Sequence, residues 1–323
     1  MIHVGFAGTF ASRLVEPVRT RLDVPCDIVV ADETAIVAKL ADVDVLVTLA
    51  FTRAMAAAAR ALRLVQVPGA GLDRIDRDAL ATGTLLANAY GHETGIAEYV
   101  MGAILTLGRE LARLDAALRR GRWESQWAPR AAPPVWAELA GKTLGIVGYG
   151  RIGQALARRA RAFDMNVLAI RRDVSQQDPH GIRAVCGPGA LHDVLADSDY
   201  VALTLPLTDE TRGILGEAEI GVMKPTAILV NVARAQLVDE DALYRALAER
   251  RIAGAALDVW YRYPTDETSS LPANRPFHEL PNVLMTPHVA GWTDGMLKAR
   301  ASVIAENIRR TARCQLPLNL IST

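Results

Sequence analysis

The chain has 323 residues, which is enough for two domains that each bury a core. Lysine plus arginine equals aspartate plus glutamate at 36 each, which excludes the strongly basic balance typical of nucleic-acid or anionic-membrane binding. No apolar run approaches the roughly 20 residues that span a bilayer, and the N-terminus lacks the order of a secretion signal. Three scattered cysteines lack metal-ligand spacing. We therefore expect a cytoplasmic protein without a metal that acts on a small molecule.

The first ninety residues alternate short apolar runs with helical segments, which predicts a parallel sheet flanked by helices. Gly5 and Gly8 lack the middle glycine of a nucleotide loop, so an ordinary turn is the favoured interpretation there. The expected strands are Ile2 to Ala7, Asp27 to Val30, Val45 to Thr48, Leu64 to Val67 and Leu85 to Asn88.

Apolar residues then recur every three or four positions from Ile96 to Leu118, which predicts one long helix over 96–120. Prolines and tryptophans between Trp123 and Ala140 predict a loop or linker after it. A long apolar stripe of this kind exceeds what one small domain comfortably buries.

A second alternating unit and a last helix, Asp294 to about Arg313, complete the chain. We expect an α/β fold of two doubly wound parallel-sheet domains, with a Rossmann cofactor domain (98–290) inserted into a flavodoxin-like substrate domain (1–97 and 291–323). The strands expected in the second unit are Thr143 to Val147, Asn166 to Ile170, Ile182 to Val185, Tyr200 to Leu205, Ala227 to Asn231, Gly254 to Val259 and Val283 to Thr286.

The run GYGRIG follows the first strand of that second unit and precedes a helical pattern. Gly148 would make the turn, Gly150 would admit a pyrophosphate, and Gly153 would let the helix pack on the strand. Phosphate oxygens could then accept from N–H groups at the helix N-terminus. The motif predicts a dinucleotide site.

The residues after the second strand of this unit bear on the choice of cofactor. An acid there holds the ribose 2′-hydroxyl of NAD, but this chain has Arg171 and Arg172. Two guanidinium groups suit a phosphate, so NADP is favoured. NAD stays possible, because the pair could be solvated on a loop and Asp173 follows it.

From Val67 to about Asn319 the chain resembles the D-isomer-specific 2-hydroxyacid dehydrogenases. The resemblance implies an inserted cofactor domain, catalysis in the cleft between domains, and hydride transfer between NAD(P)H and a 2-keto acid to give an (R)-2-hydroxy acid. It rests on GYGRIG and on PGAGLD (68–73), IAE (96–98), TLPLT (204–208), VNVAR (230–234), ALDV (256–259) and TPH (286–288).

Reduction of a 2-keto acid needs a cation for the carboxylate and carbonyl, and an acid that protonates the alkoxide. The resemblance implies Arg234 and His288 for these roles, although a structural ion pair and an ordinary polar histidine are the alternatives. It also implies backbone contacts from Ala70 and Gly71 to the substrate carboxylate, with Asp258 near the nicotinamide carboxamide. The family's cofactor contacts fall at Arg151, Ile152, Arg171, Leu205, Pro206, Val232, Ala233, Asp258 and Gly291.

One position departs from the family. Tyr263 stands where the family places the glutamate that bonds to the catalytic histidine. A phenol can hydrogen-bond an imidazole but is neutral below about pH 10, so His288 should lose its proton more easily than in relatives. Glu267, Glu93 or Asp294 could take the place of the glutamate. Formate dehydrogenases also pair their histidine with a neutral group.

His92 lies in a segment that lines the substrate pocket in relatives; a capping or surface histidine is the alternative. The leading hypothesis is an NADP-preferring 2-keto acid reductase. The alternatives are a cofactor-sensing protein like the corepressors of this fold, which Tyr263 and Ala235 favour, and formate-type hydride oxidation without a base. In relatives the helix that corresponds to 96–120 forms the dimer contact, so we expect a homodimer.

Overall fold

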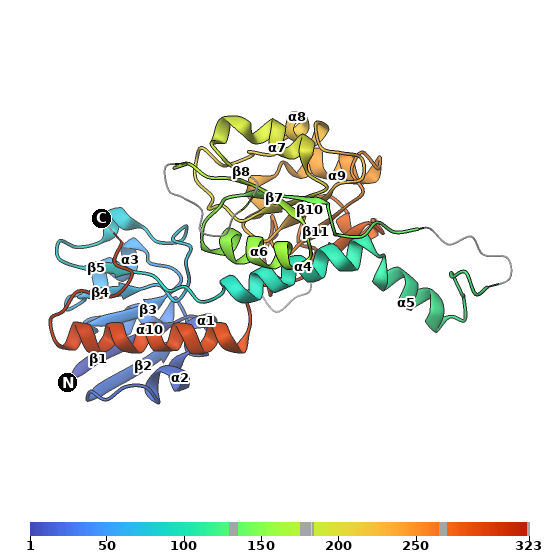
Figure 1. Cartoon of the computed structure of the whole chain (residues 1–323). Coiled ribbons are helices and arrows are strands. Elements are labelled where there is room, and N and C mark those ends of the chain that lie inside the picture. Colours follow the sequence, from blue (N-terminus) through green and yellow to red (C-terminus); the bar gives the residue numbers. More distant parts are fainter. Residues whose placement is uncertain (129–134, 175–181, 183, 265–269, 322–323) are drawn as a thin grey trace. The chain divides into compact units, whose positions relative to one another are not determined.

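The computed structural model describes residues 1–128, 135–174, 182, 184–264 and 270–321, which form two compact units (Figure 1). The first unit comprises Met1–His92 and Trp292–Thr323, and the second comprises Glu93–Gly291. The second unit is thus inserted into the chain of the first. The boundary predicted after residue 97 would divide helix α4 (Glu93–Gly108), whereas the structure keeps this helix wholly in the second unit, which begins at Glu93.

The first unit is built on a five-stranded sheet in which all neighbouring strands are parallel. Its order is β2-β1-β3-β4-β5, which is the flavodoxin-like order. Successive side chains of β3 enter opposite layers, since Val45 and Val47 join one apolar cluster and Leu46 joins the other. The strands are β1 (Ile2–Ala7), β2 (Cys26–Ala31), β3 (Val45–Thr48), β4 (Leu64–Gln66) and β5 (Leu85–Ala87).

Helices cover both faces of this sheet. Ile304 and Ile308 of the long helix α10 (Asp294–Ala312) pack on one face with residues of α2 (Val15–Arg19). On the other face lie α3 (Arg53–Ala58) and a 3₁₀ turn at 35–39. Because both faces are buried, the strands read as continuous apolar runs rather than as alternating ones. Helix α1 (Thr9–Ser12) is a single turn after β1.

The second unit contains a seven-stranded parallel sheet with the order β12-β11-β10-β9-β6-β7-β8. This order reverses at β6, as in a doubly wound Rossmann sheet. The predicted fold class of two doubly wound α/β domains is therefore confirmed. The strands are β6 (Thr143–Val147), β7 (Asn166–Ile170), β8 (Ala184–Cys186), β9 (Tyr200–Leu203), β10 (Ile228–Asn231), β11 (Gly254–Leu257) and β12 (Val283–Met285).

The helices of the second unit also form two layers. Helices α4 and α6 (Arg151–Ala162) bury Val100, Ile104 and Leu156 in one apolar cluster. The opposite cluster contains residues of α7 (Leu191–Asp197), α8 (Glu217–Gly221) and α9 (Glu240–Ala248). Within the described chain, no helix is long and apolar enough to cross a membrane.

The prediction of one continuous helix over 96–120 is wrong. Helix α4 ends at Gly108, and a separate helix α5 (Leu111–Arg119) follows Glu110, which has a φ of 50°. A residue in the left-handed region interrupts the helical ladder, so the apolar stripe is divided in two. The part on α4 is buried, whereas Leu111 and Leu118 on α5 are about half exposed at 50% and 52%.

Candidate active site

Three glycines shape the turn between β6 and α6. Gly148 has a φ of 105°, and a Cβ there would lie 2.5 Å from the backbone nitrogen of Leu205. A Cβ on Gly153 would lie 2.7 Å from the carbonyl oxygen of Gly148, whereas one on Gly150 would meet nothing within 4 Å. Packing therefore requires the first and third glycines. The second leaves its side of the turn open, which fits a pyrophosphate.

Helix α6 starts directly after this turn, with Gly150 as its N-cap and Arg151 and Ile152 as its first residues. In the part of the chain that the structure describes, no side chain caps this end, and its first turn holds no acidic residue. The N-terminal end of a twelve-residue helix favours an anion. The turn and the helix together thus suit the phosphates of a dinucleotide.

Arg171 and Arg172 follow β7, the neighbour of β6. The backbone N–H of Arg171 donates to the carbonyl oxygen of Cys186 at 3.0 Å, which holds it at the strand end. The Arg171 side chain is half-buried and that of Arg172 is exposed. Both residues therefore lie at the strand end where a Rossmann sheet meets the adenosine ribose.

Leu205 and Pro206 follow β9, on the other side of β6. The Thr204 hydroxyl donates to the carbonyl oxygen of Gly148 at 2.7 Å. The Thr211 hydroxyl donates to the carbonyl oxygen of Pro206 at 2.8 Å. The first bond holds the loop against the glycine turn, and the second closes the loop on itself. The sequence carried no signal for the Thr211 contact, because it joins a side chain to a backbone oxygen.

A turn after β10 carries Arg234. The Asn231 side-chain amide donates to the carbonyl oxygen of Arg234 at 2.9 Å, and its oxygen accepts from the N–H of Ala233 at 3.1 Å. Arg234 Nη1 donates to the carbonyl oxygen of Ala233 at 2.7 Å. Asn231 is 1% exposed and Val232 is 7% exposed. A buried amide thus fixes the backbone from which the guanidinium extends.

A carboxylate organises the loop that carries His288. Asp258 follows β11 and is 1% exposed. Its Oδ1 accepts from the Thr286 hydroxyl at 2.6 Å and from the N–H of Val289 at 2.9 Å, and its Oδ2 accepts from the N–H of Ala290 at 2.9 Å. His288 between these donors has a φ of 57°. The bonds to Asp258 therefore hold the histidine in a backbone conformation that L-residues rarely adopt.

The strand register places Arg234 and His288 at one edge of the sheet. Asn231, Leu257 and Met285 pair across β10, β11 and β12. Arg234 stands three residues beyond the first of these, and His288 three residues beyond the last. Parallel strands lie about 4.8 Å apart, so the two strand ends are roughly 10 Å apart. Both side chains thus start within reach of one small substrate.

The second unit also matches a known family. Residues 101–290 match the model described as the NAD-binding domain of D-isomer specific 2-hydroxyacid dehydrogenases. This chain belongs to the D-isomer-specific 2-hydroxyacid dehydrogenase family. It is 38% identical over 292 residues to the glyoxylate reductase of Pyrococcus furiosus, covering 88% of this chain and 84% of that one.

The chain is also similar to a longer relative and to a solved structure. It is 36% identical over 293 residues to the D-3-phosphoglycerate dehydrogenase of Methanocaldococcus jannaschii, so it spans about half (52%) of that protein's length. The structure of an acyclic imino acid reductase, Bsp5, in complex with NADPH and D-Arg, superposes with a TM-score of 0.81 at 25% identity over the full length of both chains. The family's NAD-binding domain thus accounts for the second unit.

In this family member, Tyr263 contacts His288 directly. Tyr263 Oη lies 2.7 Å from His288 Nδ1, and the two rings are tilted by 51° with centroids 5.7 Å apart. Tyr263 is 48% exposed. The phenol thus orients the imidazole from the position where the family places its glutamate, but it supplies no negative charge to favour imidazolium.

Of the three carboxylates that could replace the family's glutamate, Asp294 pairs with a lysine and Glu267 lies outside the described residues. Asp294 lies on α10 in the first unit, where its carboxylate is 3.1 Å from Lys298 Nζ. Glu93 is the first residue of α4, and Glu267 lies outside the described residues. For Tyr263, the structure shows a direct contact with His288 at 2.7 Å.

The remaining predicted substrate residues lie in the first unit. Ala70 and Gly71 follow β4, where the Asn88 amide donates to the carbonyl oxygen of Ala70 at 3.1 Å. The N–H of Ala89 donates to the carbonyl oxygen of Gly69 at 3.1 Å. These bonds join the glycine-rich turn to the end of β5. His92 is 9% exposed, so it is not a surface histidine. The substrate contacts of these residues stay predictions.

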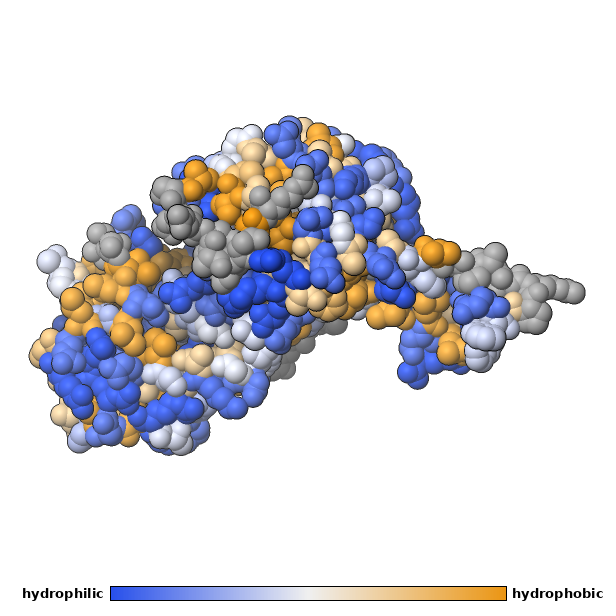
Figure 2. Space-filling view, in the orientation of Figure 1, coloured by the Kyte–Doolittle hydropathy of each residue, from blue (hydrophilic) through white to orange (hydrophobic). Residues whose placement is uncertain are grey.

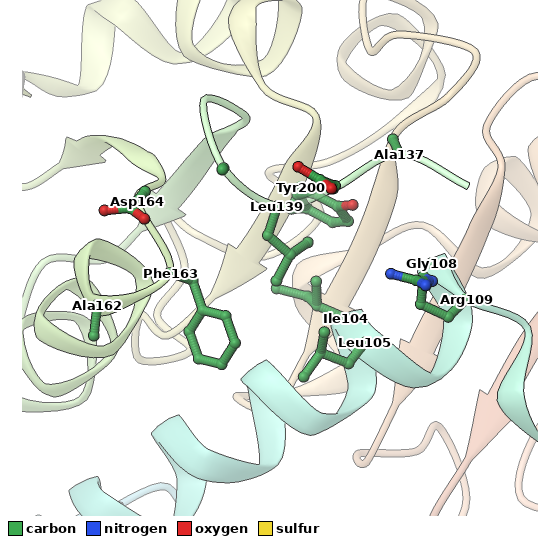
Figure 3. Close-up of a pocket in the computed structure, with 12 residues that line it drawn as sticks. Ile104, Leu105, Gly108, Arg109, Ala137, Leu139, Ala162, Phe163, Asp164 and Tyr200 are labelled. Atoms are coloured by element: carbon green, nitrogen blue, oxygen red, sulfur yellow. The ribbon is translucent and has the colours of Figure 1, made fainter. Parts of the chain in front are cut away.

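A hollow of the second unit lies at the other edge of its sheet (Figure 3). Ile104 and Leu105 of α4 face Leu139 across it, beside Phe163 at the end of α6. Tyr200 at its wall is the first residue of β9. The amino ends of parallel strands are opposite to the edge that carries Arg234 and His288. This hollow is therefore separate from the candidate active site.

Proposed function

We propose that this family member uses NADPH to reduce a 2-oxo acid to the (R)-2-hydroxy acid. The observation that carries the proposal is the pair Arg234 and His288 at the carboxyl edge of β10 and β12, with His288 held by Tyr263 at 2.7 Å and its loop held by Asp258. Ligands of open α/β sheets bind at this edge. Family membership supports the reaction type.

The residues take distinct roles in this proposal. The Arg234 guanidinium binds the substrate carboxylate and polarises the 2-oxo group, because its planar donors match both oxygens. The protonated His288 imidazole donates its proton to the developing alkoxide, while Tyr263 holds the ring at Nδ1. Backbone N–H groups of Ala70 and Gly71 add to carboxylate binding, and His92 contacts the substrate. A bound nicotinamide cofactor supplies the hydride.

The cofactor would be held mainly by the glycine turn and the ends of the neighbouring strands. The open side of Gly150 and the N-terminus of α6 fit the pyrophosphate. Arg171 and Arg172 would bind the 2′-phosphate of NADPH, and the NADPH complex of the similar imino acid reductase supports this choice over NADH. Further contacts are proposed for Arg151, Ile152, Leu205, Pro206, Val232, Ala233, Asp258 and Gly291.

A direct test is to supply NADPH or NADH with glyoxylate, hydroxypyruvate and longer 2-oxo acids. The glyoxylate reductases among the relatives support including the smallest substrates. We expect faster oxidation of NADPH than of NADH with at least one of them, and an (R)-configured product for chiral cases. Failure of the whole panel with both cofactors would refute the proposal.

A second candidate is hydride transfer that needs no charged acid. The neutral phenol of Tyr263 beside His288 favours it, because neither the oxidation of formate nor the reduction of an already protonated imine requires that histidine to carry a proton. The similar imino acid reductase structure adds support for the imine. Turnover that does not change with pH through the range in which histidine titrates would favour this candidate over 2-oxo acid reduction.

We also propose that two copies associate through α4 and α5. Figure 2 shows hydrophobic residues among hydrophilic ones over α5. Leu111, Leu118 and Trp123 are exposed by 50%, 52% and 61%, and Trp127 is exposed by 80%. Covering such side chains stabilises association by about 25 cal/mol per Å². Sedimentation should give a dimer at micromolar concentration, and a monomer there would refute this arrangement.

A further inference from the structure

The loop that carries His288 is tied to helix α4 by a chain of hydroxyl groups. Tyr99 Oη on α4 lies 2.6 Å from Thr286 Oγ1, and the Thr286 hydroxyl donates to Asp258 Oδ1 at 2.6 Å. Asp258 in turn accepts from the N–H groups of Val289 and Ala290, the two residues that follow His288. All these residues belong to the second unit.

The donors and acceptors in this series of hydrogen bonds follow from the carboxylate of Asp258 at its end. A carboxylate oxygen only accepts, so the single hydrogen of Thr286 Oγ1 goes to Asp258. Tyr99 must then donate to Thr286. Burial, more than the neighbouring charge of Asp258, raises the pKa of Tyr99 above its ordinary value, so the phenol keeps this hydrogen at every working pH.

A second anchor acts on the same residue. Trp260 is 4% exposed, and its Nε1–H donates to the carbonyl oxygen of Thr286 at 2.8 Å. The backbone N–H of Thr286 donates to the carbonyl oxygen of Leu257 at 3.0 Å. Thr286 is thus fixed at its nitrogen, its oxygen and its side chain. Only the side-chain bonds continue to the carboxylate that shapes the backbone of His288.

We propose that Tyr99 and Thr286 are positioning residues for His288, acting through Asp258, and this inference rests on the proposed function. The Thr286 hydroxyl fills one acceptor site of Oδ1 and fixes the rotation of the carboxylate. The carboxylate can then meet the Val289 and Ala290 N–H groups with both of its oxygens. Their spacing holds φ of His288 at 57° and so aims the imidazole.

The test compares substitutions that remove one hydroxyl each. Thr286→Val and Tyr99→Phe keep the shape of the side chains, Thr286→Ser keeps the hydroxyl, and Tyr200→Phe is the control, because it removes a phenol hydroxyl of the same unit outside the loop. We expect the first two to lower kcat about tenfold with KM and NADPH affinity within about twofold, since a small misplacement of an acid slows the reaction. Thr286→Ser and Tyr200→Phe should stay near wild type.

Hydrogen exchange provides a readout that does not need turnover. The amides of Val289 and Ala290 should exchange faster in Thr286→Val and Tyr99→Phe, with the sheet of the second unit unchanged. The double variant should be no worse than Thr286→Val alone, because both changes break one chain. The inference would be overturned if exchange at these amides did not change, or if exchange rose throughout the unit. It would also be overturned if Thr286→Ser lost as much kcat as Thr286→Val. A wild-type protein inert toward all 2-oxo acids would instead refute the proposed function, and exchange alone would then decide the positioning.

Discussion

The two units contain the same kind of turn, yet the two turns differ in what they can hold. Gly8 after β1 and Gly148 after β6 both have positive φ, at 88° and 105°. The turn at Gly8 leads into a four-residue helix, and a Cβ on Gly8 would lie 3.1 Å from the Glu33 side chain. The turn at Gly148 leads into twelve residues of helix and is open at Gly150. A glycine makes the turn in both units, but only in the second unit do Gly150 and the long helix α6 leave room for an anion.

The ends of the second strands sharpen this comparison. In the first unit Asp32 follows β2, and its carboxylate accepts from the N–H groups of Thr34 and Ala35 at 2.9 and 2.7 Å. The bond from Ala35, and after it the bond from Thr34, lowers the pKa of Asp32. A negative charge therefore lies beside the turn. In the second unit Arg171 holds the equivalent place. Equal topology therefore permits opposite charge, and function depends on the residues at the strand ends.

The largest effect should follow from removing the cation at the edge of β10. Arg234→Ala should lower kcat/KM for a 2-oxo acid about a thousandfold, because both carboxylate binding and polarisation of the oxo group are lost. Arg234→Lys should recover only part of this, since an ammonium cannot bind two oxygens in a plane. Steady-state kinetics with NADPH would measure both. A loss below tenfold in Arg234→Ala would contradict the proposed role.

The next effect tests the two glycine turns against each other. Gly148→Ala should destabilise the second unit by about 2 kcal/mol and weaken NADPH binding about a hundredfold, because a Cβ would meet the backbone of Leu205 at 2.5 Å. Gly8→Ala carries a similar strain in φ, but its neighbour is a flexible Glu33 side chain. It should cost about 1 kcal/mol and leave NADPH affinity unchanged. Thermal unfolding and NADPH titration would measure both variants. Equal losses of NADPH affinity in Gly148→Ala and Gly8→Ala would contradict the difference proposed between the two turns.

A smaller effect should follow from giving the second unit the charge of the first. Arg171→Asp places a carboxylate where Asp32 stands in the first unit, and should lower the preference for NADPH over NADH about tenfold or more by repelling the 2′-phosphate. Arg172→Ala, at the exposed neighbour, should change it less. The ratio of kcat/KM for the two cofactors measures this. An unchanged ratio in both variants would show that neither arginine selects the cofactor.

The smallest effect concerns the partner of His288. Tyr263→Glu restores a carboxylate, which stabilises imidazolium, so the proton needed for reduction persists to higher pH. In Tyr263→Glu, the pH at which the rate of reduction falls should therefore rise by about one unit. Tyr263→Phe should leave this pH unchanged and lower the rate a few-fold, because the imidazole of His288 loses the hydrogen bond that orients it. Rates of 2-oxo acid reduction from pH 5 to 9 provide the measurement. If the rate of reduction fell at the same pH in the wild type and both variants, Tyr263 would not be the partner that sets the protonation of His288.

The sequence predicted most elements of the fold because each strand is a short buried run between turn residues. Strands β1, β6 and β7 have the predicted bounds, but β9 ends at Leu203 rather than at Leu205. The difference has a local reason, since Thr204 turns its hydroxyl to Gly148 and begins the loop. Periodicity could not reveal the break at Glu110, because apolar residues recur every three or four positions on both sides of it, at Leu107, Leu111 and Leu114.

By itself, the sequence determined the two parallel sheets, the glycine turn, and the strand ends on which Arg234 and His288 stand, because these depend on residues close together in the chain. Tertiary structure alone decided that Tyr263 meets His288 and that Tyr99 meets Thr286, 187 positions away. No spacing rule predicts a hydrogen bond between such distant residues. Only the packed sheet and its helices bring their side chains together.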